Sequence, residues 1–261
     1  MVDNPRMHPT DPSDQHKRVI LLAWATSMGA DPQEVLTVAD QPGSGPHRFP
    51  VLSDHADSKI ASVIRIYNIT FIYGPSWFLQ AANEIDDEIL ALESTLIRLG
   101  ASHGARSLGE TTLYYAEDLP EISGSDAVAI SEDREFITEL EARCPSDDVG
   151  AAALSQTAQT FAVVSDQDPG NLQVVAGSGY EEWASLIADL TVLVDPDFRG
   201  HGLGTYAVAV AAEEAFMAGL IPQWRAAMGH RAAQRMADAM GFQLSGSQTT
   251  LKIEATESHA G

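Results

Sequence analysis

The sequence has a single cysteine, Cys144, among its 261 residues. One thiol excludes an internal disulfide framework and any zinc site built from several cysteines, so we expect no metal centre of that kind. Basic residues are also few: 15 Lys and Arg stand against 37 Asp and Glu, a formal net charge of -22. A surface of that sign repels phosphate backbones and anionic lipid, so nucleic acid and membranes are not expected partners.

Long hydrophobic runs are absent as well. Residues 207–212 form one of the longest apolar stretches, and they are far shorter than a membrane span. Residues 1–17 are polar and lack the apolar core of a signal peptide. Together with the single thiol, this composition predicts a cytoplasmic protein.

What is present is the composition of a folded protein, with 44% apolar and 20% charged residues. The length suits two small domains. We expect tails at 1–17 and 256–261, an N-terminal α/β domain at 18–125 and a second domain at 126–255. Residues 118–126 carry Pro, Gly and Ser without periodicity, which is typical of a linker.

The N-terminal region has strand and helix patterns but no chemical motif. Residues 19–27 predict a buried helix, and residues 61–73 predict a long strand or a hairpin turning at Asn68. Residues 77–99 predict one helix, because apolar side chains recur at helical spacing, and residues 111–115 predict a short strand. This region would line an acceptor pocket, form a degenerate half of a duplicated fold, or provide a homodimer surface.

The C-terminal region alternates helices and strands. We expect helices after Ser131 and over 147–159, strands over 160–165, 172–179 and 186–194, a helix over 202–217, a strand over 222–227, a helix over 230–240 and a strand over 242–253.

The most informative motif is Arg199-Gly-His-Gly-Leu-Gly204, which follows a strand and opens a helix. Glycines let backbone amides approach a ligand closely, and the positive end of the helix dipole lies there, so the motif predicts a pyrophosphate site. A P-loop would need a Lys that is missing here. A dinucleotide fingerprint would need a third glycine where Thr205 stands. The remaining alternative is a glycine-rich turn without a ligand.

Residues 192–204, Val-Leu-Val-Asp-Pro-Asp-Phe-Arg-Gly-His-Gly-Leu-Gly, resemble the acyl-CoA-binding motif R/Q-x-x-G-x-G/A of the GNAT superfamily of N-acyltransferases. The segments 218–225 and 233–242 resemble the fifth strand and the helix ending in Gly-Phe of that family. The resemblance covers roughly residues 130–254. It implies an α/β (α+β) fold with a mixed, mostly antiparallel sheet flanked by helices.

The resemblance also implies acetyl-CoA or another acyl-CoA as co-substrate and an amine as acceptor. Main-chain groups of three strand residues would pair with the pantetheine arm, and the loop after them would hold the pyrophosphate. These residues are Val192, Leu193, Val194, Arg199, Gly200, His201, Gly202, Leu203, Gly204 and Thr205.

The acid and base residues common in the family are missing from their usual positions. Ala237 stands where a Tyr often acts as acid, and Arg225 stands where some relatives have a Glu base. We consider Asp189 as a base and His230 as a proton donor; the alternatives are a solvated strand-edge carboxylate and a helix cap. Two functions follow: an N-acetyltransferase, or a CoA-binding module without turnover.

Overall fold

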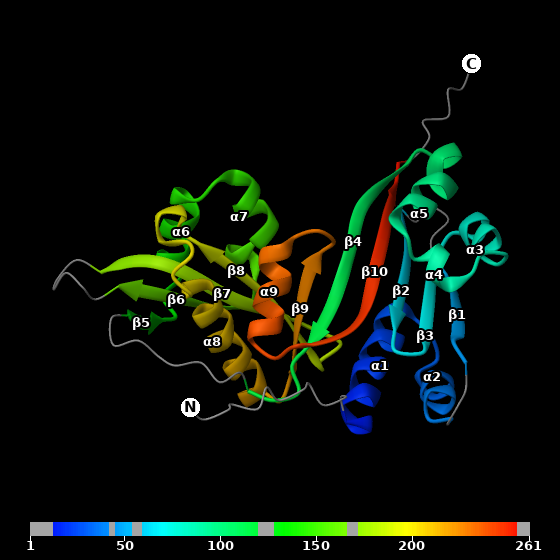
Figure 1. Cartoon of the computed structure of the whole chain (residues 1–261), viewed down its shortest axis with the longest axis horizontal. Coiled ribbons are helices and arrows are strands. Elements are labelled where there is room, and N and C mark those ends of the chain that lie inside the picture. Colours follow the sequence, from blue (N-terminus) through cyan, green and yellow to red (C-terminus); the bar gives the residue numbers. More distant parts are fainter. Residues whose placement is uncertain (1–12, 42–44, 54–58, 120–127, 166–171, 255–261) are drawn as a thin grey trace, which may run out of the picture. The chain divides into compact units, whose positions relative to one another are not determined.

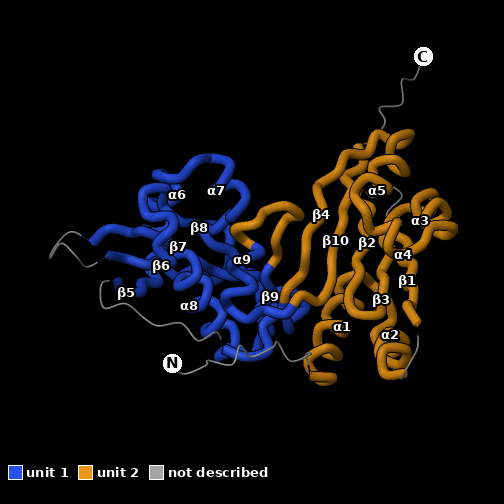
Figure 2. The backbone as a smooth tube through the Cα atoms, viewed as in Figure 1, with its two compact units in different colours: residues 1–12, 115–224, 234–243 blue, residues 13–114, 225–233, 244–261 orange. Residues whose placement is uncertain are grey.

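The computed structural model describes residues 13–41, 45–53, 59–119, 128–165 and 172–254 (Figure 1). The chain forms two compact units, drawn in different colours in Figure 2. Among the described residues, unit 1 contains those within 115–224 and 234–243, and unit 2 contains those within 13–114, 225–233 and 244–254. Residues 225–233 and 244–253, which the domain prediction assigned to the C-terminal half, therefore group with unit 2.

Unit 1 is built on a mixed sheet with the strand order β9-β8-β7-β6-β5. All neighbours in it are antiparallel except β8 and β9. Its elements are β5 (Val128–Ser131), α6 (Arg134–Arg143), α7 (Ser146–Ala152), β6 (Gln159–Ser165), β7 (Gln173–Trp183), β8 (Ile187–Val194), α8 (Leu203–Met217), β9 (Ile221–Ala227) and α9 (Arg231–Ala239). This order confirms the mostly antiparallel sheet flanked by helices; β9 ends, and α9 begins, in unit 2.

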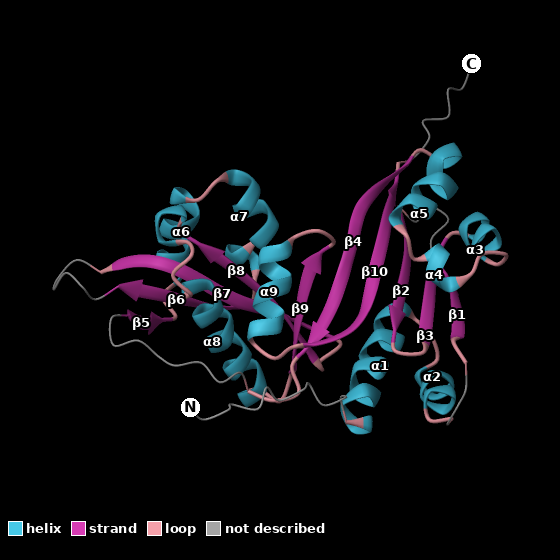
Figure 3. Cartoon of the chain, viewed as in Figure 1, coloured by secondary structure: helices cyan, strands magenta, loops and turns pink. Residues whose placement is uncertain are grey.

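Helices cover both faces of this sheet (Figure 3). Alternate residues of a strand face opposite sides. Leu193 packs with Ile137 and Leu140 of α6 on one face. Val192 and Val194 pack on the other face with Ala207 of α8. α6 comes close to β7 because Gly177 has no side chain: a Cβ there would lie 2.9 Å from Ile137 Cδ1.

In unit 2 the sheet has the strand order β1-β3-β2-β10-β4. Its elements are α1 (Asp14–Met28), α2 (Pro32–Ala39), β1 (His47–Leu52), β2 (Ile60–Ile66), β3 (Ile69–Gly74), α3 (Ser76–Ala82), α4 (Asp87–Leu90), α5 (Glu93–Gly100), β4 (Ala105–Tyr115) and β10 (Gln243–Ile253). Strand β1 is parallel to β3, and the pairs β2–β3 and β2–β10 are antiparallel. The hairpin of β2 and β3 confirms the predicted turn at Asn68.

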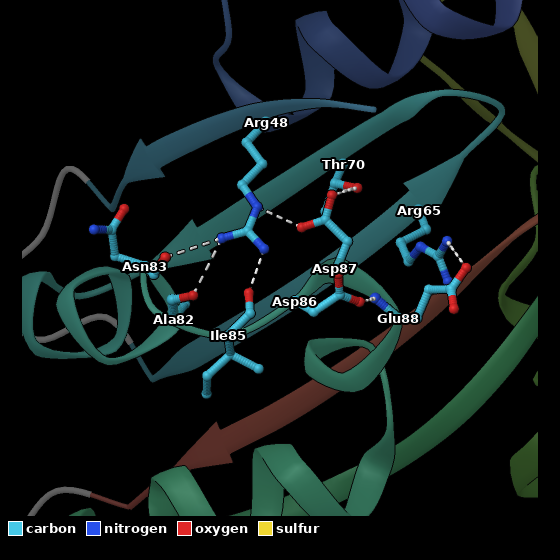
Figure 4. Close-up of polar contacts among 9 residues, drawn as sticks. All are labelled: Arg48, Arg65, Thr70, Ala82, Asn83, Ile85, Asp86, Asp87 and Glu88. Atoms are coloured by element: carbon cyan, nitrogen blue, oxygen red, sulfur yellow. Dashed lines mark hydrogen bonds and ion pairs between the residues drawn. The ribbon is translucent and has the colours of Figure 1, made fainter. Parts of the chain in front are cut away.

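A charged network fastens α3 and α4 to this sheet (Figure 4). The Nε of Arg48 on β1 lies 2.5 Å from Oδ1 of Asp87, whose other oxygen accepts a hydrogen bond from Thr70 at 2.9 Å. The same guanidinium donates to the carbonyls of Ala82 and Ile85 at and beyond the end of α3. The Asp87 side chain is only 9% exposed, so its charge depends on Arg48 and Thr70 for compensation.

The prediction of one helix over 77–99 was wrong. Three short helices occupy this stretch, because the Asp86 side chain accepts from the Glu88 amide and starts α4 anew, and Leu92 adopts extended backbone angles before α5. Helix α1 also begins at Asp14, inside the expected tail, where Ser13 caps it. Strand β1 and helix α2 were not foreseen, and the helix expected over 147–159 ends at Ala152. The linker region 120–127 lies outside the described residues.

Candidate functional site

Strands β8 and β9 run parallel and separate partway along their length. Their ladder pairs Ile187 with Ile221, Ala188 with Pro222 and Asp189 with Gln223. Strand β8 continues to Val194, paired with β7 over its whole length. The edge of β8 that faces β9 is therefore open beyond the ladder, as the resemblance implied for the strands that receive pantetheine.

The direction of the main-chain groups follows from two hydrogen bonds. The carbonyl of Leu186 accepts from Ile221 of β9, and the amide of Asp195 donates to Val175 of β7. Because main-chain groups alternate sides along a strand, even-numbered residues of β8 face β9 and odd-numbered ones face β7. Val192 and Val194 thus present N–H and C=O groups to the open edge. Leu193, the third predicted contact, directs its own groups to β7 and buries its side chain against α6.

A tight loop connects β8 to α8. Asp195 starts a 3-10 turn, Pro196–Phe198, by accepting from the amide of Asp197 at 3.0 Å. Gly200 and Gly202 then adopt φ of +81° and +80°, a backbone region that disfavours side chains. Helix α8 follows directly with Gly202 as its N-cap, which confirms the predicted start within one residue.

The loop turns a row of backbone amides outward. Within the described chain, the first amide of α8 to find a backbone acceptor is that of Tyr206, which donates to Gly202 at 3.0 Å. The amides of residues 202–205, from the N-cap to the third helical residue, are the four orphan donors of the helix N-terminus. A Cβ added at Gly200 or Gly202 would meet no atom within 4 Å, so the space on the side-chain side of these two residues is open. Together with the helix dipole, this is the geometry of an anion site.

Gly204 has a different role from the other two loop glycines. Its backbone is helical, and a Cβ there would lie 3.1 Å from Val194 Cγ2 and 3.2 Å from Met236 Cε. The missing side chain lets α8 approach β8 and α9 closely. Leu203 packs into the core beside Val194, and the ring Nδ1–H of His201 donates to Phe198 O at 3.2 Å.

Two arginine–aspartate pairs flank the loop. Arg143 of α6 lies 3.0 Å from Asp195, whose side chain is 6% exposed. Arg199 lies 2.7 Å from Asp148 of α7, and both of these side chains are nearly half exposed. The Nε of Arg199 also donates to the carbonyl of Val194 at 3.3 Å. The cation of the motif is therefore held by the chain itself.

Cys144 lies beside these pairs, with its Sγ 3.7 Å from the carbonyl of Val194. Burial, and then the negative charge of Asp195, raise the pKa of the thiol above its usual range. A raised pKa keeps the group protonated at neutral pH, and a protonated thiol is a poor nucleophile.

Polar side chains cross one sheet face where the ladder ends. Asp189 is opposite Glu181 on β7 and opposite Gln223 on β9, and paired residues share a face. Gln223 is 1% exposed; its Oε1 accepts from Trp183 Nε1 at 3.2 Å, and its Nε2 donates to Tyr115 OH at 2.7 Å. The indole is only a donor, so it fixes the orientation of the amide. Sequence reasoning missed Gln223 and Tyr115, because no motif marks either residue.

The remaining candidates lie elsewhere. His230 belongs to unit 2, and its Nδ1 accepts a hydrogen bond from the Ala233 amide at 3.3 Å, as a helix cap does. Ala237 of α9 is buried at 1% exposure and offers no proton. Among the described residues, no group of three or more His, Cys, Asp or Glu side chains has a metal-binding arrangement. Within those residues, no helix combines the length and apolar character that crossing a bilayer requires.

Comparison with known proteins gives one family match. Residues 129–242 match the model of the Acetyltransferase (GNAT) family. No curated protein matches the chain.

Several solved structures are similar in part. A GCN5-related N-acetyltransferase from Kribbella flavida is 18% identical, with 62% of this chain and 65% of that chain covered and a TM-score of 0.48. A GCN5-related N-acetyltransferase-like protein from Streptococcus suis is 16% identical, with 77% and 86% covered and a TM-score of 0.46. A GCN5-related N-acetyltransferase from Sphaerobacter thermophilus is 16% identical, with 92% and 93% covered and a TM-score of 0.45.

Proposed function

Because residues 129–242 form a GNAT acetyltransferase domain, we propose that this protein transfers an acyl group, most simply acetyl, from acyl-CoA to an amine. The family match of residues 129–242 supports acyl transfer in general, and the proposal adds the donor, the acceptor class and the residues that serve them.

The observation that carries the proposal is the combination of the open amide row with the open edge of β8. The amides of residues 200–205 suit a pyrophosphate, which accepts several N–H donors and favours a helix N-terminus. Val192, whose main-chain groups face the gap, suits the amide groups of a pantetheine arm added as an extra strand. ATP or NAD would place phosphates on the loop but would leave the strand edge unused.

The spacing of the two features indicates where the thioester would lie. From Val194, next to the loop, back to Asp189 the strand covers five residues, roughly 17 Å. An extended pantetheine arm is of similar length. We therefore expect the thioester at the end of the ladder, beside the face that carries Asp189 and Gln223.

The chemistry requires a neutral amine. A free amine with a pKa near 10 is mostly charged at neutral pH, so a group in the site must take its proton, directly or through water. Asp189 is our candidate for this base. The amine nitrogen then attacks the thioester carbonyl, the C–N bond forms and the C–S bond breaks. The nitrogen loses its second proton to water as the C–S bond breaks, and the departing thiolate takes a proton from water, so the products are the amide and the free thiol of CoA.

The chain's charge bears on the acceptor. A net charge of -22 concentrates cationic molecules at the surface, so we expect amines to be preferred over anionic acceptors. We also propose a cytoplasmic location, on the single cysteine.

The second candidate is a CoA-binding module without turnover. The buried Ala237 favours it, because this position often carries a Tyr acid in the family and offers no proton here. The site would then keep its ligand as a sensor or an interaction module.

Two experiments distinguish these proposals. Calorimetric titration with CoA, acetyl-CoA, NAD and ATP tests the ligand; binding of NAD without binding of CoA would overturn both. Thiol release from acetyl-CoA with a panel of amines tests turnover. Acceptor-dependent release supports the enzyme, whereas tight CoA binding without release supports the module.

A further inference from the structure

We infer that Asp148 sets the affinity of the loop for its anionic ligand, because it holds Arg199 in a position that the ligand must displace. This inference rests on the proposed acyl-CoA site and adds a residue to it. We call the ion pair of Arg199 and Asp148 the latch.

The latch occupies two groups that the ligand would use. The guanidinium of Arg199 is the cation of the glycine motif, and its Nη2 lies 2.7 Å from Asp148 Oδ2. Its Nε donates to Val194 O, and Val194 lies on the open side of β8. A pyrophosphate would therefore compete with Asp148 for the guanidinium of Arg199. The first amide of the pantetheine arm would compete with Arg199 for the carbonyl of Val194.

The latch is also an ion pair that a ligand can break at little cost. Asp148 and Arg199 are 42% and 48% exposed, and an ion pair in that setting contributes little net stability. The neighbouring pair of Arg143 and Asp195 is different, since Asp195 is 6% exposed and also caps the turn after β8. Breaking the latch leaves this second pair to keep α6 attached to the loop.

Asp148→Asn tests the inference, with Asp147→Asn as the matched control. Asp147 is the preceding residue of the same helix, and it loses the same charge without being part of the latch. Asp148→Asn should bind CoA about three- to fivefold more tightly than the wild type, the range of an exposed ion pair. Asp147→Asn should change affinity less than twofold, and both variants should keep the wild-type melting temperature within a few degrees.

A second background makes the test specific to Arg199. The Arg199→Gln variant should bind CoA several-fold more weakly than the wild type. Adding Asp148→Asn to this variant should then raise the affinity for CoA no more than adding Asp147→Asn does. If Asp148→Asn raises the affinity for CoA equally with and without Arg199, the effect comes only from the lost negative charge, and the inference is overturned. Weaker binding in Asp148→Asn would also overturn it, because Asp148 would then be orienting Arg199 for the ligand. Failure of the wild type to bind CoA at all would instead reject the proposed function.

Discussion

Gly202→Asp should abolish CoA binding while leaving the protein folded. Gly202 is the N-cap of α8, with φ of +80° and open space where a Cβ would be. The substitution places a carboxylate over the amides that we assign to the pyrophosphate. The substitution tests whether these amides hold the pyrophosphate, because it alters the charge at the loop and leaves the rest of the chain unchanged.

The magnitude follows from Coulomb's law. A carboxylate about 5 Å from one phosphate charge costs about 0.8 kcal/mol at the dielectric of water and about 3 kcal/mol at an effective dielectric of about 20. Two phosphate charges double these values. The smaller total, about 1.7 kcal/mol, already weakens binding about 15-fold. The larger one removes binding from the range of a calorimetric titration.

Gly219→Asp is the matched control. Gly219 follows the other end of α8, with the same φ of +80° and equally open space. Both substitutions cost about 1 kcal/mol or slightly more for a side chain in the left-handed region. An acidic residue is unfavourable at a helix C-terminus and favourable at an N-terminus, so the control is the less stable variant. Calorimetry should show lost CoA binding only in Gly202→Asp. Wild-type affinity in that variant, or equal loss in both, would refute the assignment.

Three further changes test other parts of the molecule. Asp189→Asn should lower turnover with CoA affinity unchanged, and the loss should be largest at low pH, where the amine most needs a base; full turnover across the pH range would assign the base elsewhere. Asp87→Asn should destabilise unit 2 by about 3 kcal/mol in urea unfolding, because Arg48 loses its buried counter-charge, whereas Glu88→Gln should cost under 1 kcal/mol. Cys144 should react with iodoacetamide several-fold more slowly than free cysteine at pH 8, because its thiol has a raised pKa. The reaction should become faster as the pH rises toward that pKa. A rate above that of free cysteine would contradict the burial of the thiol.

The sequence was most informative where local rules decide the structure. The alternate glycines after Arg199 predict a loop that only glycine conformations allow, and Gly200 and Gly202 adopt them. The β-branched and aromatic residues on both sides of Asn68 predict a long strand or a hairpin, and the hairpin forms, because strand pairing across a short turn is a local event. Periodicity over residues 77–99 failed, since the Asp86 side chain caps a new helix, and a cap outweighs a repeating pattern of apolar residues.

The site depends on contacts that no local pattern encodes. Asp148 reaches Arg199 from 51 residues earlier in the chain, and Tyr115 reaches Gln223 across 108 residues. The family resemblance placed Leu193, like Val192 and Val194, among the main-chain contacts of the pantetheine arm. The register of β8 instead directs the main-chain groups of Leu193 to β7. The sequence by itself therefore determined the loop and the fold class, and it predicted the class of ligand. Only the tertiary structure decided which strand edge is open and which carboxylate holds the cation, because both depend on which distant segments pack together.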